Sequence, residues 1–77
     1  MPVNLDKLDD AVLALLHLTS FRDGEITRAW KGHNWDALNR LFEKGLISNP
    51  KSKAKSVVMS DQGIARGKEL FARLFED

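Results

Sequence analysis

The chain of 77 residues contains no cysteine and no tyrosine, and it has only two histidines and two prolines. Without cysteine it can form neither a disulfide nor a thiolate metal site. No apolar run approaches the ~20 residues that span a membrane. The first residues show no basic segment followed by an apolar stretch, so we expect no signal peptide and a cytoplasmic location.

The sequence also lacks the patterns that carry chemistry. We find no serine in a nucleophile elbow, no glycine-rich phosphate loop and no carboxylate pair at acid/base spacing. Neither histidine has a second ligand at a convincing spacing. We therefore predict no enzymatic activity, no metal site, no cofactor and no small-molecule ligand.

The length predicts one small domain over residues 1–77. A chain of this size buries only about 60% of its unfolded surface, so close helix packing or a partner subunit is needed. The net charge is only +1, but it is unevenly distributed. Residues 31–55 hold six basic and two acidic side chains, whereas the segments on either side are slightly acidic. The basic excess therefore lies in the middle of the chain.

Several segments begin with a side chain that can cap a helix. Asn, Asp and Ser accept hydrogen bonds from the free N–H groups of a first turn, and glycine favours a helix end. These signals predict four helices, at residues 5–19 after Asn4, 25–30 after Asp23, 35–44 between Asn34 and Gly45, and 61–75 after Ser60. The second and third would be joined by a turn at residues 31–34, which is a helix-turn-helix pattern.

Residues 46–48 and 56–59 are candidate strands of one β-hairpin. Its tip carries Lys51, Lys53 and Lys55, with no acidic residue between Glu43 and Asp61. The fold class predicted is mainly α with a small β-hairpin (α+β), in the order of three helices, hairpin and a fourth helix. The lysines either bind phosphates or an acidic partner, or they keep an exposed tip soluble and unpaired.

Three stretches carry a resemblance to a known family: Leu38-x-x-Leu41-x-x-x-Gly45-Leu46-Ile47, the basic turn, and Val57-Val58-Met59-Ser60-x-x-Gly63. In these stretches the segment 25–63 resembles winged helix-turn-helix regulators of the MarR type. The whole chain also resembles a small bacterial family of unknown function. The first resemblance implies a winged-helix fold, double-stranded DNA as a partner and a role in transcription regulation.

The third predicted helix has two distinct faces. By spacing, its buried face consists of Trp35, Leu38, Leu41 and Phe42. On the opposite face, Asn39 matches the edge of adenine and Arg40 that of guanine. Asp36 and Glu43 share this face and would repel phosphates, and Asp36 can pair with Arg40 four residues later. The helix therefore either reads bases in the major groove or presents a solvated or protein-facing surface.

These patterns predict a DNA-binding module, with a protein-interaction or assembly domain as the alternative. The candidate DNA-binding residues are Arg28, Lys31, His33, Asn39, Arg40, Lys51, Lys53 and Lys55. Trp30 and Trp35 flank the turn and could stack on bases, but in so short a chain we expect them to be core residues. Ile26 and Ala29 should point inward with Trp30.

The first and last helices also predict a homodimer. The apolar arc of the first helix is wider than one neighbour covers, and Leu13 falls on its opposite face. That helix is either a core helix with one exposed leucine or a helix shared with a dimer interface. The candidate interface residues are Leu13, Leu70, Phe71, Leu74 and Phe75. Alternatively, Phe71 and Leu74 fill the core of the domain.

Overall fold

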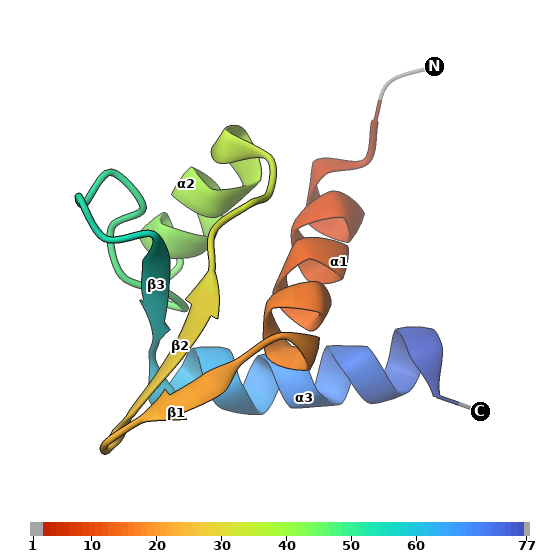
Figure 1. The fold of residues 1–77 in the computed structure, drawn as a ribbon. Helices are drawn as coiled ribbons and strands as arrows, with labels where there is room; N and C mark the ends of the chain where they lie inside the picture. Colours follow the sequence, from red (N-terminus) through yellow and green to blue (C-terminus); the bar gives the residue numbers. More distant parts are fainter. Residues whose placement is uncertain (1–2, 77) are drawn as a thin grey trace.

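Helices and strands are interleaved along the chain in the computed structural model, which describes residues 3–76 (Figure 1). In chain order they are α1 (Leu5–Leu18), β1 (Phe21–Asp23), β2 (Ile26–Trp30), α2 (Trp35–Glu43), β3 (Ser56–Met59) and α3 (Asp61–Phe75). The strands form one antiparallel sheet in the order β1-β2-β3. The prediction of a winged helix-turn-helix fold with four helices and a single hairpin is therefore wrong.

The error lies in residues 25–30, which contribute strand β2 instead of a second helix. Six residues are too few to form a stable helix alone. Ala29 is buried while Trp30 is exposed, which follows the two-residue period of a strand. Gly24, with φ of 66°, takes the first place of a two-residue turn, where a type II′ hairpin favours glycine. Because β2 precedes α2, the helix-turn-helix motif is absent from the described residues.

The remaining three helices begin where their caps predict. The side chains of Asn4, Asn34 and Ser60 accept hydrogen bonds from the backbone N–H groups of Lys7, Ala37 and Gly63, respectively. Helix α2 ends just before Gly45, whose φ of 77° is one that glycine adopts readily. The predicted ends of these helices are confirmed to within one residue.

Helix α1 packs against both α2 and α3, with the sheet beside it (Figure 1). At the crossing with α3, a Cβ on Gly67 would lie 3.1 Å from the Cβ of His17 and 3.4 Å from the carbonyl oxygen of Leu13. Only glycine therefore fits comfortably at this contact. Leu13 is 1% exposed, so the expectation that it lies on an exposed face is wrong. It is buried because α1 has a neighbour on each side.

The predicted hairpin after α2 is present only in part. Ile47 forms a single bridge with Met59, and the N–H of Ser48 donates to the carbonyl of Val58 at 2.8 Å. The main partner of β3 is β2, not residues 46–48. Residues 49–55 form a loop of turns and bends beyond this bridge.

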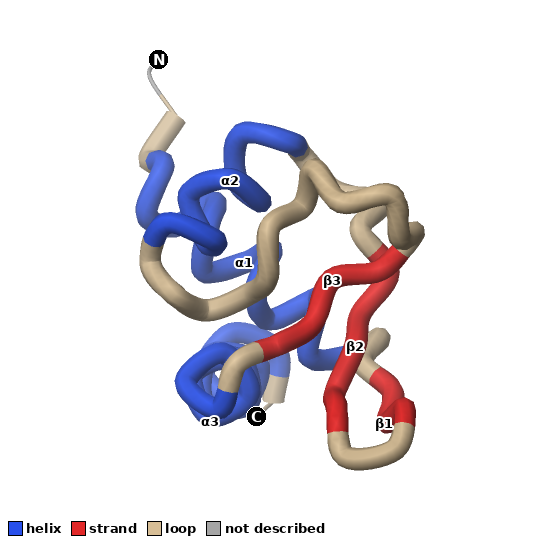
Figure 2. The backbone as a smooth tube through the Cα atoms, turned by 90° about the vertical axis from the view of Figure 1, so that its left-hand side faces the viewer, coloured by secondary structure: helices blue, strands red, loops and turns tan. Residues whose placement is uncertain are grey.

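The sheet has one covered and one uncovered face. Ala29, Val57 and Met59 point from the covered face into the core, and all three are buried. Figure 2 shows the helices gathered on that side, with no described segment lying over the other side. The uncovered face of the sheet and the loop 49–55 are thus both accessible.

Candidate nucleic-acid interface

Loop 49–55 presents three lysines to solvent. The side chains of Lys51, Lys53 and Lys55 are all exposed, as their position in the sequence predicts. Among residues 3–76, none of these lysines lies within ion-pair distance of a carboxylate. Three uncompensated positive charges on one loop suit a polyanion.

Lys31 anchors this loop to the sheet. Its ammonium group donates to the carbonyl oxygens of Pro50 and Ser52, both at 2.7 Å. Its backbone N–H donates to the carbonyl of Lys55 at 3.2 Å, which extends the β2–β3 ladder by one pair. Lys31 is also a predicted DNA contact, and two donors of its ammonium group fix the loop that carries the other lysines.

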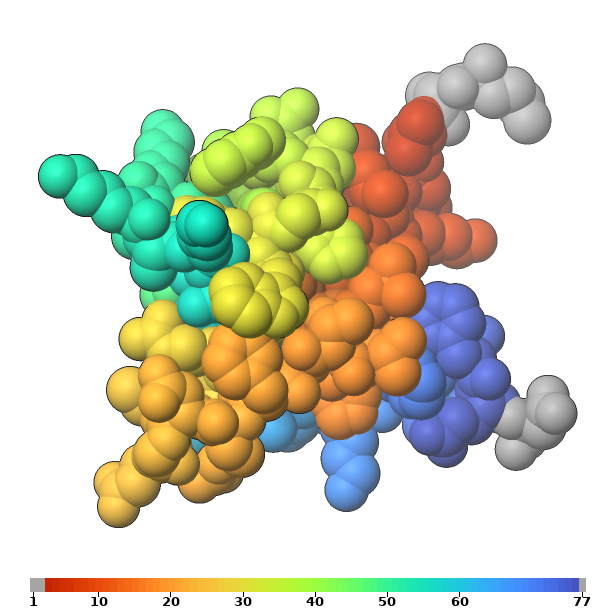
Figure 3. Space-filling view, in the orientation of Figure 1, coloured from red at the N-terminus to blue at the C-terminus, as the bar shows by residue number. Residues whose placement is uncertain are grey.

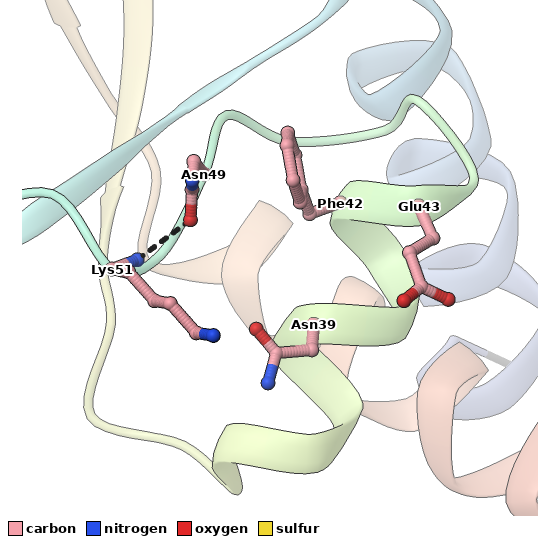
Figure 4. A pocket seen from close by; sticks show the side chains of 5 residues that line it. All are labelled: Asn39, Phe42, Glu43, Asn49 and Lys51. Atoms are coloured by element: carbon pink, nitrogen blue, oxygen red, sulfur yellow. Dashed lines mark hydrogen bonds between the residues drawn. The ribbon is translucent and has the colours of Figure 1, made fainter.

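A small groove separates this loop from α2 (Figure 4). Its volume is about 220 Å³, and it is lined by Asn39, Phe42, Glu43, Asn49 and Lys51. Figure 4 shows the side chains of Lys51 and Asn39 extending toward one another across the groove. The N–H of Lys51 donates to the side chain of Asn49 at 2.9 Å, which orients the loop there. The structure thus brings together two predicted site residues from separate elements.

Arg40 is held by a carboxylate that the sequence did not single out. Its Nε and Nη2 donate to the carboxylate of Asp9 at 2.8–3.0 Å, and Lys44 Nζ lies 3.3 Å from the same group. Asp9 is fully buried between α1 and α2. Burial raises the pKa of Asp9, but hydrogen bonds from Arg40 and Lys44 outweigh it and hold the pKa below its ordinary value.

The ion pair between Arg40 and Asp9 limits which side chains of α2 are free to contact a partner. The hydrogen bonds that Arg40 donates to Asp9 raise the pKa of Arg40, so the guanidinium is charged and committed to Asp9. Asp36 forms no ion pair with Arg40 within the described chain, although the sequence predicts one. The exposed side chains of α2 then include Asp36 and Glu43. Two-point reading of guanine by Arg40 would require breaking the contact with Asp9.

Comparison with known proteins identifies the family. A domain of unknown function, DUF6429, matches residues 4–77. The chain belongs to this family. It is also similar to the uncharacterized protein y4hR of Sinorhizobium fredii (strain NBRC 101917 / NGR234), with 51% identity over 75 residues that cover 97% of both chains. No solved structure matches the chain.

Membership of DUF6429 confirms the predicted resemblance to a bacterial family of unknown function. It lends no support to the resemblance to MarR-type regulators, and the observed order of elements contradicts that resemblance. Within residues 3–76, no helix is long and apolar enough to cross a membrane. The same residues contain no cluster of three side chains that could hold a metal ion.

The aromatic side chains of this DUF6429 domain lie mainly at its surface. Trp30, Trp35 and Phe42 are 56%, 52% and 42% exposed, so their prediction as core residues is wrong. Trp30 points from the uncovered sheet face, and α2 turns Ala37 inward in place of Trp35. Ile26, also predicted to point inward, lies on the same uncovered face as Trp30. Reading residues 26–30 with a period of two would have found this arrangement.

The two remaining basic candidates lie beside the sheet. Arg28 Nη1 donates to the hydroxyl of Ser56, and its Nε lies 3.3 Å from the carboxylate of Asp23. Its head group therefore bridges β1 and β3. His33 is half-buried in the turn between β2 and α2. Neither residue lies in loop 49–55.

The predicted interface residues divide into buried and exposed sets. Leu13 and Leu70 are core residues, each 1% exposed, so they cannot meet a partner in this conformation. Phe71 is half-buried, and its ring packs at a tilt against that of His17. Leu74 and Phe75 are 48% and 53% exposed at the end of α3. Of the five predicted interface residues, only this last pair is exposed.

Proposed function

We propose that the protein is a non-enzymatic DNA-binding module whose loop 49–55 contacts phosphates. The observation that carries the proposal is the set of three exposed lysines without carboxylate partners in the described chain. Lysine contacts to phosphate supply most of the sequence-independent affinity of a DNA-binding protein.

The anchoring of the loop strengthens the proposal. Two hydrogen bonds from Lys31 and the ladder contact at Lys55 hold the loop backbone to β2. A loop held in this way loses less conformational entropy on binding than a free one. Asn39 lies across the groove from Lys51, where it could meet a base or sugar next to a bound phosphate. Arg40 has no direct role in this proposal.

The test removes the three loop charges together. Binding of fluorescently labelled DNA is measured by anisotropy at several salt concentrations for the wild type and for Lys51→Ala/Lys53→Ala/Lys55→Ala. Each lost phosphate contact should reduce the log–log salt slope by ~0.7 for single strands and ~0.9 for duplex. We expect the triple variant to bind at least tenfold more weakly at low salt and to lose about 2 units of slope with a single strand, or nearly 3 with a duplex.

The control variant removes an equal charge elsewhere. Arg22→Ala/Arg66→Ala/Lys68→Ala alters β1 and α3, away from the loop and from the groove between α1 and α3, and should retain nearly all the affinity and slope. If both triple variants weaken binding equally, the attraction is general and the loop has no special role. Unchanged binding by the loop variant would refute the proposal.

A second candidate function is assembly through α1 and α3. Leu74 and Phe75 are half exposed, and Leu74 borders a groove of about 380 Å³ between the two helices. The groove is lined by Lys7, Asp10, Ala11, Leu70, Arg73 and Leu74. Exposed apolar patches of a few hundred Å² often mark interfaces. This observation supports self-association as a homodimer, which is compatible with DNA binding on the far side of the molecule.

A further inference from the structure

The uncovered face of the sheet carries an aromatic pair that the fold does not bury. Phe21 and Arg28 are paired across β1 and β2, and Trp30 lies two residues further along the same face. The ring centroids of Phe21 and Trp30 lie 5.2 Å apart, and the interplanar angle is 34°. Trp30 is nevertheless 56% exposed. One side of this pair is therefore open to a flat ligand.

Packing gives no reason for a tryptophan at this position. The opposite face of the sheet completes the core with Ala29, Val57 and Met59. An indole that stays half in solvent contributes less to stability than a buried one. Aromatic rings exposed on a sheet are, however, suited to stacking on unpaired bases.

The two ends of this face differ in charge. At the turn end of the β1–β2 hairpin lie Asp23 and Glu25, whereas the other end of β2 adjoins the lysine loop. Trp30 is the register partner of Ser56, the residue that follows Lys55. Figure 3 shows the side chains of β1 and β2, in orange and yellow, directly beside those of the loop, in green and teal. A base on the aromatic pair would thus leave its phosphates near the lysines.

A duplex cannot use this arrangement well. In a double helix the faces of the bases are stacked on their neighbours, and only their edges are accessible. A single strand presents both base faces and phosphates, and it is flexible enough to follow an aromatic–basic surface. The combination of an open indole and adjacent ammonium groups therefore matches an unpaired strand.

We propose that the nucleic acid bound is single-stranded, with a base stacked on Trp30 and Phe21 and the adjoining phosphates held by Lys51, Lys53 and Lys55. This inference deepens the proposed function and rests on it, since the lysine loop supplies the electrostatic part of the affinity. Arg28 lies on the same face of the sheet, where its guanidinium group contacts Asp23 and Ser56.

The experiment compares Trp30→Leu with Trp30→Phe by anisotropy. The probes are a labelled ten-nucleotide oligothymidylate, the corresponding oligouridylate and a labelled ten-base-pair duplex. Loss of base–aromatic stacking costs ~1–3 kcal/mol, which corresponds to a loss of about 5- to 150-fold in affinity. We expect Trp30→Leu to lose this amount with the single strands and Trp30→Phe to stay within about threefold. Circular dichroism should show that both variants are folded.

A spectroscopic readout separates stacking from general packing. In a Trp35→Phe background Trp30 is the sole tryptophan, because the chain contains two. Its fluorescence should be quenched as oligothymidylate is added.

If Trp30→Leu binds as tightly as the wild type, or if the wild type prefers the duplex, the inference is overturned. Should the lysine variant still lose affinity, the proposed function survives that result. If no probe binds even at low salt, both proposals fail. The tighter of the two single strands identifies DNA or RNA as the ligand.

Discussion

Asp9 connects α1 to α2 through side-chain hydrogen bonds. Its carboxylate is buried, yet it accepts hydrogen bonds from Arg40 and Lys44 on α2. A buried charge is tolerated only when it is paired and hydrogen-bonded. Arg40 and Lys44 still reach solvent, with side-chain exposures of 26% and 45%. Removing Asp9 therefore leaves their charges partly solvated.

We predict that Asp9→Asn lowers the free energy of unfolding at pH 7 by about 1–3 kcal/mol, as loss of hydrogen bonds to a charged group does. Urea denaturation measures the change. Asp10→Asn is the matched control, because Asp10 is next in sequence but forms no ion pair in the described chain. A loss of equal size in both variants would show that the buried ion pair contributes no more to the free energy of unfolding than Asp10 does.

The same ion pair predicts a pH dependence. Because the folded pKa of Asp9 lies below its ordinary value of 3.8, its contribution is fully present above that value. The contribution is lost as the pH falls through the lower, folded pKa. The stability difference between wild type and Asp9→Asn should therefore be constant near neutral pH and shrink below about pH 4. A difference that grows under acid would contradict this assignment.

At the scale of elements, α3 is placed by two glycines without Cβ atoms. A Cβ built on Gly63 would collide with the backbone carbonyl of Leu46, and one on Gly67 would crowd His17. The first of these contacts is with backbone, which cannot rotate away. Close approach here lets Ser60 bond to the carbonyl groups of Gly45 and Leu46. The start of α3 is thus tied to the end of α2.

We predict that Gly63→Ala destabilises the protein by about 1–3 kcal/mol, the range expected for overpacking. This would occur although alanine favours a helix by ~1 kcal/mol over glycine. Gly32→Ala is the control, since a Cβ at Gly32 meets nothing within 4 Å and its φ is not positive. Thermal unfolding compares the variants. A Gly63→Ala protein as stable as the wild type would show that α3 can shift without cost.

The local parts of the fold could be predicted from the sequence, and the long-range parts could not. Caps at Asn4, Asn34 and Ser60 depend on neighbours three residues away, so the pattern alone reveals them. Strand β2 depends on pairing with residues 56–59, far along the chain. In isolation residues 25–30 look like a short capped helix, and the three-stranded sheet was therefore missed.

The same distinction applies to the candidate site. The exposed lysines of the loop could be predicted because a run without acidic residues or large apolar side chains stays in solvent. The partner of Arg40 lies 31 residues away on α1, and the carbonyl groups bound by Lys31 lie 19 and 21 residues away. Spacing within one helix predicts Asp36 as the partner of Arg40. In the structure the partner is Asp9, because tertiary packing, which helix spacing does not reveal, brings α1 beside α2.

At the scale of the whole molecule, the two proposed surfaces lie at opposite ends. Figure 1 places the sheet and loop on one side and the end of α3 on the other. A symmetric dimer through α3 would leave the lysine loops of both copies accessible. Two such loops on one particle would raise the avidity for a long strand.

We predict self-association that depends on Phe75. Sedimentation equilibrium at tens of micromolar should give a mass above that of the monomer, and Phe75→Glu should return the protein to the monomer mass. A charge in an apolar interface is costly unless paired. Lys68→Glu, also exposed on α3, serves as the control. A wild type that stays monomeric at these concentrations would exclude the dimer without affecting the proposal on DNA.

The central claim is that loop 49–55 binds the phosphates of a nucleic acid. Its most direct test is the affinity of the wild-type protein for an oligothymidylate as a function of salt. If three lysines each displace a counterion, the slope of log affinity against log salt should be about −2 for a single strand. Affinity that does not change with salt, or no binding at the lowest salt, would contradict the account.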